Sequence, residues 1–419
     1  MSSTRVISEA SLRFLSEVGN STNVQKGYRT ISLRTISSYD SNDTIEVPDF
    51  LNSSESLQFC GFETQIADLL YHNWTRDNEE IGPGSLGYGR PVVALAREYI
   101  KSMSRGGDAM READDWEGAL KKQGIKSSTR QRILDPNFKN IRLSRSASEW
   151  ALDTLQLSWE FLDGLDSRVE RVKKENEMRS VSPDPSVKPS KAVKSSATLS
   201  STLHSGSLTL QTAIETETPK DIPGRTLLHK GGAWSRLISI FNPDGSLDLT
   251  DIVSTPPVDF HPTRYDLYFS KQWEVVREYA EFAQRRVPAE QATVLTIAVP
   301  SSFLSEAKVI HGSDWNKMIW CSRNKRALIS NRGVLPEELN DYENAEVLIG
   351  LICGIGNDQV ERLKRGEELP VLKTKGGMKG SQVALQGPSM LARFKSECRG
   401  FVWVSPLLSP KKAKYFPPL

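Results

Sequence analysis

The residue types that most often carry chemistry are dispersed along this 419-residue chain. Its four cysteines and five histidines form no CxxC pair and no zinc-ligand spacing, so the sequence predicts no metal site. The stretch GLICGIG, residues 350–356, is glycine-rich but lacks the Gly-Lys-Ser/Thr ending and the following helix of a phosphate-binding loop. The sequence contains neither a GxSxG elbow nor a Ser/His/Asp spacing that would suggest a hydrolase.

The most distinctive stretch is RYDLYFSKQWEVVREYAEFAQRR, residues 264–286. Its first half alternates, with Leu267 and Phe269 on one face and Tyr268 and Ser270 on the other, which is typical of a strand. Its second half has apolar residues at three- and four-residue steps, which indicates one face of a helix. Ser270 is a good N-cap for that helix. The strand therefore ends on Tyr-Phe-Ser, directly before an aromatic-rich helix.

The elements around this stretch predict an α+β domain over residues 223–408, followed by a tail at 409–419. Further strands are expected at RTLLHKGG, ATVLTIAVP, AEVLIGL, SQVALQG and FVWVS, and a further helix at SDWNKMIWCSRNKRA. The Val, Ile and Leu content of ATVLTIAVP favours a strand buried on both faces.

A helical domain is expected over residues 56–172. Ser146 and Glu149 have the spacing of a capping box, and apolar residues follow them at three- and four-residue steps. We interpret these aromatic and leucine stripes as core, because no residues in this block suggest chemistry. Residues 1–55 are rich in Ser, Thr and Asn and show little periodicity, so they are expected to be disordered.

Residues 173–222 are expected to form a disordered linker between the two domains. Ser, Thr, Pro and Lys dominate this segment and aromatic residues are nearly absent. Such a composition buries too little apolar surface to offset the entropy lost on ordering the chain. The fold class predicted for the whole chain is therefore multidomain, with a helical N-terminal domain and an α+β C-terminal domain.

Composition excludes several classes of function. The net charge is +2, from 54 basic and 52 acidic residues, and a dedicated nucleic-acid binder would carry a larger basic excess. No run of 18 apolar residues is present, so no membrane span is expected. The N-terminal segment lacks the apolar core of a signal peptide, and the cysteines show no disulfide pattern. An intracellular protein, cytoplasmic or nuclear, is expected.

Four stretches in order resemble ADP-ribosyltransferase-like domains, most closely an uncharacterised family related to poly(ADP-ribose) polymerase-type catalytic domains. TLLHKGG resembles their opening strand, and YDLYFSKQWEVVREYA their second motif. DWNKMIWCSRNKRALISNR with YENAEVLIGLICGIGNDQV, and then GSQVALQGPSMLARF, are similar to the motifs that follow. The resemblance covers residues 224–405, just under half of the chain. It implies an ADP-ribosyltransferase-like C-terminal domain with NAD as its substrate.

The resemblance also implies roles for particular residues. Tyr268 would stack on the nicotinamide, Ser270 would orient the strand end, and Tyr279 would flank the pocket. His229 would bond ribose hydroxyls, since imidazole both donates and accepts at neutral pH. Gln382 stands at the catalytic position, at the head of the closing strand.

This sequence departs from the usual pattern at two positions. Active transferases have a glutamate where Gln382 stands, and an amide cannot offset the positive charge that develops on the ribose. Gln382→Glu is therefore expected to raise turnover. Lys230 follows His229 where a glycine is usual, and Gly231 and Gly232 are expected to restore a close backbone approach one residue later.

Two functions remain open. The first is NAD-dependent mono-ADP-ribosyl transfer to an unknown protein acceptor, or weak NAD cleavage. The second is a catalytically inactive module that binds a partner protein or a nucleotide. A carboxylate beside Gln382 would favour the first function, and Glu397 and Asp358 are the candidates for it.

Overall fold

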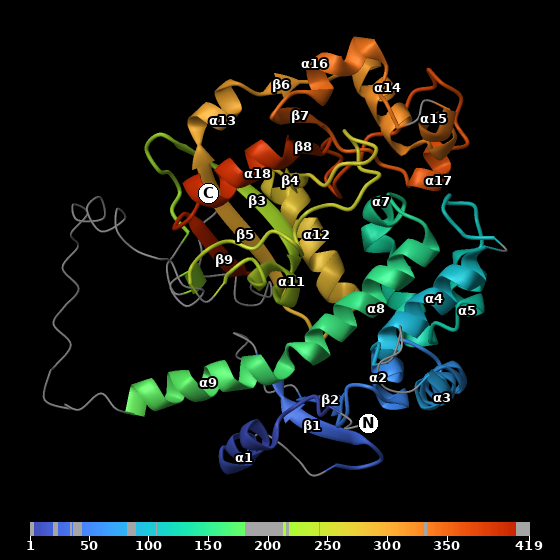
Figure 1. Cartoon of the computed structure of the whole chain (residues 1–419), viewed down its shortest axis with the longest axis vertical. Coiled ribbons are helices and arrows are strands. Elements are labelled where there is room, and N and C mark those ends of the chain that lie inside the picture. Colours follow the sequence, from blue (N-terminus) through green and yellow to red (C-terminus); the bar gives the residue numbers. More distant parts are fainter. Residues whose placement is uncertain are drawn as a thin grey trace, which may run out of the picture.

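The structure is a computed structural model that describes residues 4–19, 24–33, 36, 44–81, 89–105, 107–180, 213–214, 218–242, 244–330 and 333–407. A mostly helical N-terminal region precedes a C-terminal region that contains the larger sheets, so the fold is mixed α+β (Figure 1). In the described part of the chain, no helix is long and apolar enough to cross a membrane.

The N-terminal region pairs a small hairpin with a set of helices. Its elements are α1 (Glu9–Glu17), β1 (Tyr28–Ser32), β2 (Thr44–Pro48), α2 (Ser54–Phe59), α3 (Thr64–Ile81), α4 (Val92–Ser104), α5 (Trp116–Lys122), α6 (Ser127–Ile133), η2 (Pro136–Phe138), α7 (Lys139–Arg142), α8 (Ala147–Asp163) and α9 (Leu165–Ser180). The predicted capping box is confirmed at the start of α8, where Ser146 and Glu149 bond each other's backbone.

The first 55 residues differ from the expectation of disorder. Where the structure describes them, they form α1 and the antiparallel pair β1–β2, and Leu15, Ile31 and Val47 are buried. The reason is tertiary, because α1 packs on α9 and the Ser8 backbone N–H donates to the Asp166 carboxylate at 2.9 Å. These contacts are too distant in sequence to leave a local pattern.

The structure also differs from the prediction at the start of the linker. Helix α9 continues beyond residue 172 to Ser180, and residues 181–212 lie outside the described part of the chain.

The C-terminal region contains two sheets and the helices that cover them. Its elements are β3 (Arg225–Ala233), α11 (Trp234–Ile238), β4 (Leu267–Phe269), α12 (Trp273–Arg286), β5 (Ala292–Pro300), α13 (Ser301–Ser305), β6 (Lys308–Val309), α14 (Gly312–Arg323), α15 (Lys325–Ser330), η3 (Glu337–Leu339), α16 (Asn340–Glu343), β7 (Val347–Leu351), α17 (Asn357–Val360), β8 (Ser381–Leu385), α18 (Gly387–Glu397) and β9 (Val402–Pro406). One sheet has the order β3-β5-β9 and the other β4-β8-β7-β6.

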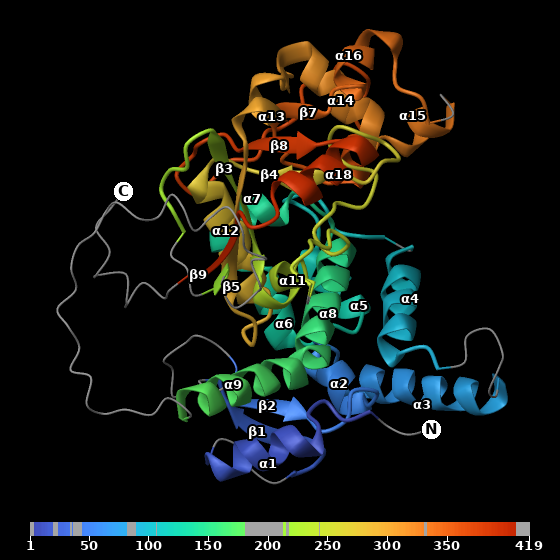
Figure 2. The same ribbon diagram turned by 60° about the vertical axis from the view of Figure 1, so that its left-hand side comes forward.

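Helix α12 connects the two halves of the molecule. It packs on β3 and β5, and its opposite side contacts α6 of the N-terminal region (Figure 2). The Phe282 ring stacks on Phe138 with centroids 5.1 Å apart and meets Trp150 edge-on at 4.9 Å. One hydrophobic cluster therefore runs from the N-terminal helices into the C-terminal region and includes Val287.

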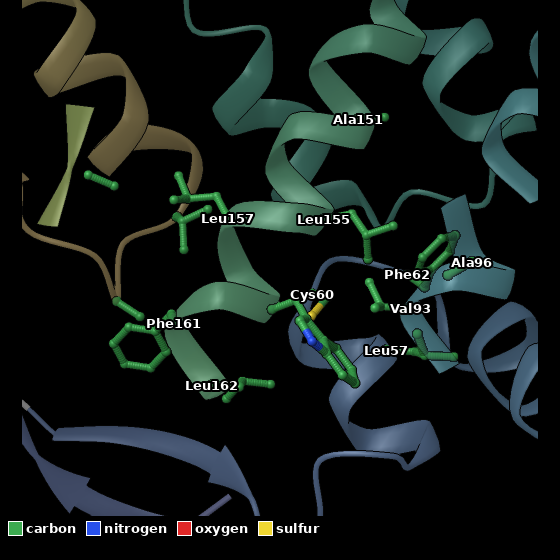
Figure 3. Packing of buried hydrophobic residues seen from close by; sticks show 14 of the residues in the cluster. Leu57, Cys60, Phe62, Val93, Ala96, Ala151, Leu155, Leu157, Phe161 and Leu162 are labelled. Carbon is green, nitrogen blue, oxygen red and sulfur yellow. The ribbon is translucent and has the colours of Figure 1, made fainter. Parts of the chain in front are cut away.

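Helix α8 supplies much of this shared core. Leu155 and Leu157 are both almost fully buried, and they point to different sides of the helix (Figure 3). Leu155 extends toward Phe62 and Val93, whereas Leu157 lies on the other side of α8 (Figure 3). A helix that is apolar on more than one side must be covered on each of them.

Buried charges also join the two halves. The Asp153 carboxylate on α8 lies 2.6 Å from the Arg286 guanidinium and 3.0 Å from that of Arg236. Burial alone would raise the pKa of Asp153, but the two guanidinium groups hold that pKa well below its ordinary value of 3.8. A second buried pair, Arg168 with Glu290 at 2.9 Å, lies on the same boundary.

We predict that the two halves do not fold as independent domains. When residues 1–180 and 213–419 are expressed as separate chains in one cell, the two should purify as a complex. The reason is that separation exposes Phe282, Val287 and the charges of Arg286 and Asp153. Size-exclusion chromatography of the co-expressed chains checks this. Two stable, monomeric fragments that elute apart would contradict it.

Asp153→Asn should destabilise the protein by about 3–5 kcal/mol at pH 7, because the buried Arg286 guanidinium loses its counter-charge, whereas Arg236 still has Glu160 at 3.2 Å. Since the folded-state pKa is depressed, this contribution is complete well above pH 3.8 and declines as the pH falls below it. Urea unfolding should therefore show that the difference in unfolding free energy between the wild type and Asp153→Asn becomes smaller at low pH. Asp163→Asn, at an exposed position on the same helix, should change stability by less than about 0.5 kcal/mol.

Candidate functional site

The two C-terminal sheets meet at a backbone bridge between β3 and the end of β4. The His229 N–H donates to the Ser270 carbonyl at 2.8 Å, and the Ser270 N–H donates to the His229 carbonyl at 2.8 Å. Two sequence-predicted site residues are therefore direct neighbours, although 40 positions separate them in the chain. We call this junction the seam.

Strand β8 brings Gln382 to the same junction. Tyr268 pairs with Ala384 across the β4–β8 ladder, and the Ser270 hydroxyl donates to the Ser381 carbonyl at 2.8 Å. Because side chains alternate along a strand, Gln382 and Ala384 share the face on which Tyr268 lies. The seam thus gathers His229, Tyr268, Ser270 and Gln382.

Ser270 is placed at the seam by its hydroxyl rather than by capping a helix. Helix α12 begins at Trp273, and its N-cap residue is Gln272, which makes no side-chain cap bond. The Ser270 hydroxyl instead accepts from the Gln272 N–H at 3.0 Å and holds the turn between β4 and α12. The predicted N-cap role is therefore wrong, because two residues intervene before the first helical turn.

A carboxylate does lie beside Gln382, and it belongs to Asp259. The Gln382 amide Nε2 donates to Asp259 Oδ2 at 2.7 Å. The Cys353 N–H donates to the same oxygen at 3.1 Å, and Arg323 Nη1 lies 2.9 Å from Oδ1. Gln382 is only 8% exposed, so this is a buried polar cluster with one ion pair. Burial would lower the pKa of Arg323, but Asp259 reverses the effect and raises it.

Sequence reasoning missed Asp259 and looked to Glu397 and Asp358. Those two carboxylates pair elsewhere, Glu397 with Arg393 at 3.3 Å and Asp358 with Lys325 at 3.6 Å. Asp259 lies in the loop PPVDFHP, residues 256–262, which has no periodicity that would predict its position. Its distance from Gln382 in the sequence is 123 residues, so only the tertiary fold brings the two together.

The Tyr268 side chain is held by the same loop. Its hydroxyl accepts from the Phe260 N–H at 3.2 Å, and the two rings lie 5.9 Å apart with their planes tilted by 40°. Burial raises the pKa of Tyr268 well above its ordinary value, and the charges of Asp266 and Asp259 add to this. The phenol is therefore neutral and its ring is in contact with Phe260.

His229 is half-buried and neutral at pH 7. Its Nδ1 shares a 2.9 Å hydrogen bond with the Thr296 hydroxyl, and its ring meets Trp273 edge-on with centroids 5.6 Å apart. Burial lowers the pKa of His229, since the charged imidazolium would lose water there. Trp273 remains 39% exposed at the start of α12.

Lys230 and Tyr279 add titratable groups near the seam. The Lys230 ammonium donates to the Tyr268 carbonyl at 3.1 Å, and burial, reinforced by Arg236 and Arg145, lowers its pKa to about 8. Burial raises the pKa of Tyr279 to about 12. Tyr279 packs against the core shared by the two halves, which is the ordinary place for a helix aromatic.

Gly231 serves helix packing in this structure. A Cβ at Gly231 would lie 1.8 Å from the Val276 carbonyl oxygen of α12. A Cβ at Gly232 would meet only the Leu237 side chain, at 3.5 Å or more. The close backbone approach expected at this glycine is thus made by a helix of the chain itself.

Among the described residues, no group of three or more His, Cys, Asp or Glu side chains is arranged to hold a metal ion. Comparisons with protein-family models, with curated proteins and with solved structures found no match to this chain. The function must therefore be argued from the seam itself.

Gly231→Ala should lower the unfolding free energy by about 3 kcal/mol, because the added methyl group forces α12 away from β3. Gly232→Ala is the matched control and should cost less than about 1 kcal/mol, since its new contacts are of ordinary length. Urea unfolding measures both. Equal stability of the two variants would mean that α12 does not approach β3 as closely as described.

Proposed function

We propose that the seam is an NAD site of ADP-ribosyltransferase type, and that the protein transfers single ADP-ribose units or cleaves NAD slowly. The observation that carries this proposal is the 2.7 Å contact between Gln382 and the Asp259 carboxylate. The neutral Gln382 lacks the charge that this chemistry needs, and Asp259 supplies one at the head of β8. The ADP-ribosyltransferase-like fold of residues 223–408 is part of the same proposal.

The residues of the seam have complementary binding roles in this proposal. The flat ring of Tyr268 offers a face for the nicotinamide, and an offset stack is worth about 1 kcal/mol beyond area burial. His229, neutral at pH 7, offers both a donor and an acceptor to ribose hydroxyls. Phe260 now contacts the Tyr268 ring, so a ligand that stacks on that side displaces the loop of residues 256–262.

The proposed reaction breaks the bond between the anomeric ribose carbon and the nicotinamide nitrogen. Nicotinamide leaves with the bonding electron pair, and positive charge develops on the ribose. The Asp259 carboxylate stabilises that charge, while the Gln382 amide keeps the carboxylate in place and bonds ribose hydroxyls. A nucleophilic oxygen of a protein acceptor, or of water, then bonds to the anomeric carbon and loses its proton to solvent.

The ion pair between Asp259 and Arg323 affects the rate expected for NAD cleavage. A guanidinium 2.9 Å from Asp259 neutralises much of its charge, which favours slow cleavage or single transfer over polymer synthesis. The same observation favours a second function, in which the chain is a catalytically inactive module that binds a protein or nucleotide. In that case Asp259 is a structural acceptor for three donors. An intracellular location, with no dedicated nucleic-acid binding, belongs to both proposals.

The test is NAD binding and nicotinamide release by the full chain. Calorimetry should detect NAD binding at millimolar concentration or below, and His229→Ala should weaken it about tenfold by removing a hydrogen-bonding group. Asp259→Asn should slow nicotinamide release about a hundredfold, because one preorganised electrostatic contact is lost. Gln382→Glu, which the sequence alone predicts to raise turnover, should now give little gain in nicotinamide release, because the new carboxylate would lie beside Asp259 and the two would share a proton.

Stability has to be separated from chemistry in these variants. Asp259→Asn leaves the buried Arg323 without its counter-charge. The double variant Asp259→Asn/Arg323→Met removes both charges. Its nicotinamide release is compared with that of the wild type at equal folded fraction. Binding of NAD without any cleavage would select the inactive module. Absence of NAD binding by the intact protein at millimolar concentration would reject both forms of the NAD proposal.

A further inference from the structure

A cavity of about 680 Å³ lies between the hairpin β1–β2, the helices α2, α6 and α8, and the segment that joins α12 to β5. Small-molecule sites commonly have volumes of roughly 300–1,000 Å³. Three parts of the chain that are far apart in sequence contribute walls, represented by Tyr28, Lys126 and Val287. None of the seam residues His229, Tyr268, Ser270 and Gln382 lines this cavity.

Two cations line the cavity without a carboxylate partner. Lys126 and Arg132 are both partly buried, and neither forms an ion pair within the described residues. In the described part of the chain, the Lys126 ammonium donates to the Gln58 carbonyl alone, at 2.6 Å. Burial lowers the pKa of Lys126, and the nearby Arg132 lowers it further. Two positive charges that repel each other in a partly dry site favour a bound anion.

The remaining charges of the lining do not neutralise this pair. Arg286, at 4% exposure, is already bonded to Asp153 and to the Thr154 hydroxyl. Glu63 pairs with Arg130 at 2.9 Å. Glu46, on the hairpin, is exposed to solvent, so its charge is screened. The excess of positive charge therefore lies on the α6 side, at Lys126 and Arg132.

The hydroxyl groups of two buried residues also line the cavity. Thr129 and Ser158 are 3% and 4% exposed, and neither side chain makes a hydrogen bond within the described residues. These two hydroxyl groups are therefore available to a ligand. Thr129 lies on α6 between Lys126 and Arg132, which adds a donor beside the two cations.

Apolar side chains form another part of the lining. Phe59, Phe62 and Val287 contribute to it, and the Phe59 ring stacks on Phe161 with centroids 5.9 Å apart (Figure 3 shows Phe62 and Phe161). A ligand that fills the cavity thus meets cations, hydroxyl groups and apolar surface.

We propose that this cavity binds a small molecule of nucleotide size that carries a phosphate group on an aromatic body. The phosphate would lie between Lys126 and Arg132 with the Thr129 hydroxyl as a third donor, and the aromatic body would lie against the apolar wall. A phosphate suits this set better than a single carboxylate, because it presents more acceptor oxygens and up to two charges. The proposal is independent of the function of the seam.

Such a ligand would stabilise the contact between the halves. The cavity is complete only when the hairpin, the helices and the segment after α12 are assembled, so binding is coupled to the folded state. A ligand that binds only the native protein raises its melting temperature, and above Kd the stabilisation grows with the logarithm of the ligand concentration.

The experiment titrates the full chain with AMP and with phenyl phosphate, and uses adenosine as the uncharged control. At least one phosphate should bind by calorimetry and raise the melting temperature, whereas adenosine should bind at least tenfold more weakly. Arg132→Gln and Lys126→Gln should each weaken phosphate binding at least tenfold, because each removes a charge-assisted hydrogen bond. Lys122→Gln, at an exposed lysine on α5, should leave the affinity unchanged.

Two further measurements test whether phosphate binding is electrostatic and whether it occurs in this cavity. Affinity should fall as salt is raised from about 50 to 200 mM, since the attraction is electrostatic. His229→Ala, at the seam, should not alter the affinity for the phosphate compounds. Absence of binding by both phosphates overturns the proposal. It is also overturned if binding is insensitive to Arg132→Gln and Lys126→Gln in folded variants, or is lost with His229→Ala.

Discussion

The two-sided burial of α12 is the constraint on which the rest of the structure depends. One side of this helix approaches β3 so closely that the Val276 carbonyl occupies the space beside Gly231, and the other side packs Phe282 between Phe138 and Trp150. A helix in this position cannot leave the sheet without opening the core of the N-terminal helices. The helical region is thus part of the same folding unit as the sheets.

The seam depends on this helix as well. The turn that leads from β4 into α12 contains Ser270, whose backbone bridges to His229 and whose hydroxyl bonds β8. Any movement of α12 would therefore shift the strand ends that carry Tyr268 and Gln382. The loop with Asp259 and Phe260 is held from the other side, by Arg323 and by the Tyr268 hydroxyl. In the proposed NAD site, a ligand would therefore enter by displacing that loop, while α12 stays in place.

The positive side chains along the boundary between the halves differ in how they are satisfied. Arg286 and Arg236 share the buried Asp153, and Arg168 has Glu290, so these charges hold the two halves together. Lys126 and Arg132, close by on the same boundary, have no such acid within the described residues. The contrast separates charges that stabilise the fold from charges that remain available to a ligand.

The sequence by itself determined most of the local elements, because their signals are local. The capping box at Ser146, the buried run of β5 and the strand-to-helix change after Tyr268 all appear in the structure. The candidates His229, Tyr268 and Gln382 came instead from the resemblance of four stretches to ADP-ribosyltransferase-like motifs.

Only the tertiary structure decided which groups surround those candidates. Asp259 reaches Gln382 across 123 residues from a loop without periodicity, and Gly231 faces a helix because of how α12 docks. The hairpin within the first 55 residues forms because α1 finds α9, and the cavity near Arg132 exists because three distant segments meet. Hydrophobic periodicity and capping act over a few residues, whereas contacts between loops and distant helices leave no local pattern. That difference in range is the physical reason why the elements could be predicted and their surroundings could not.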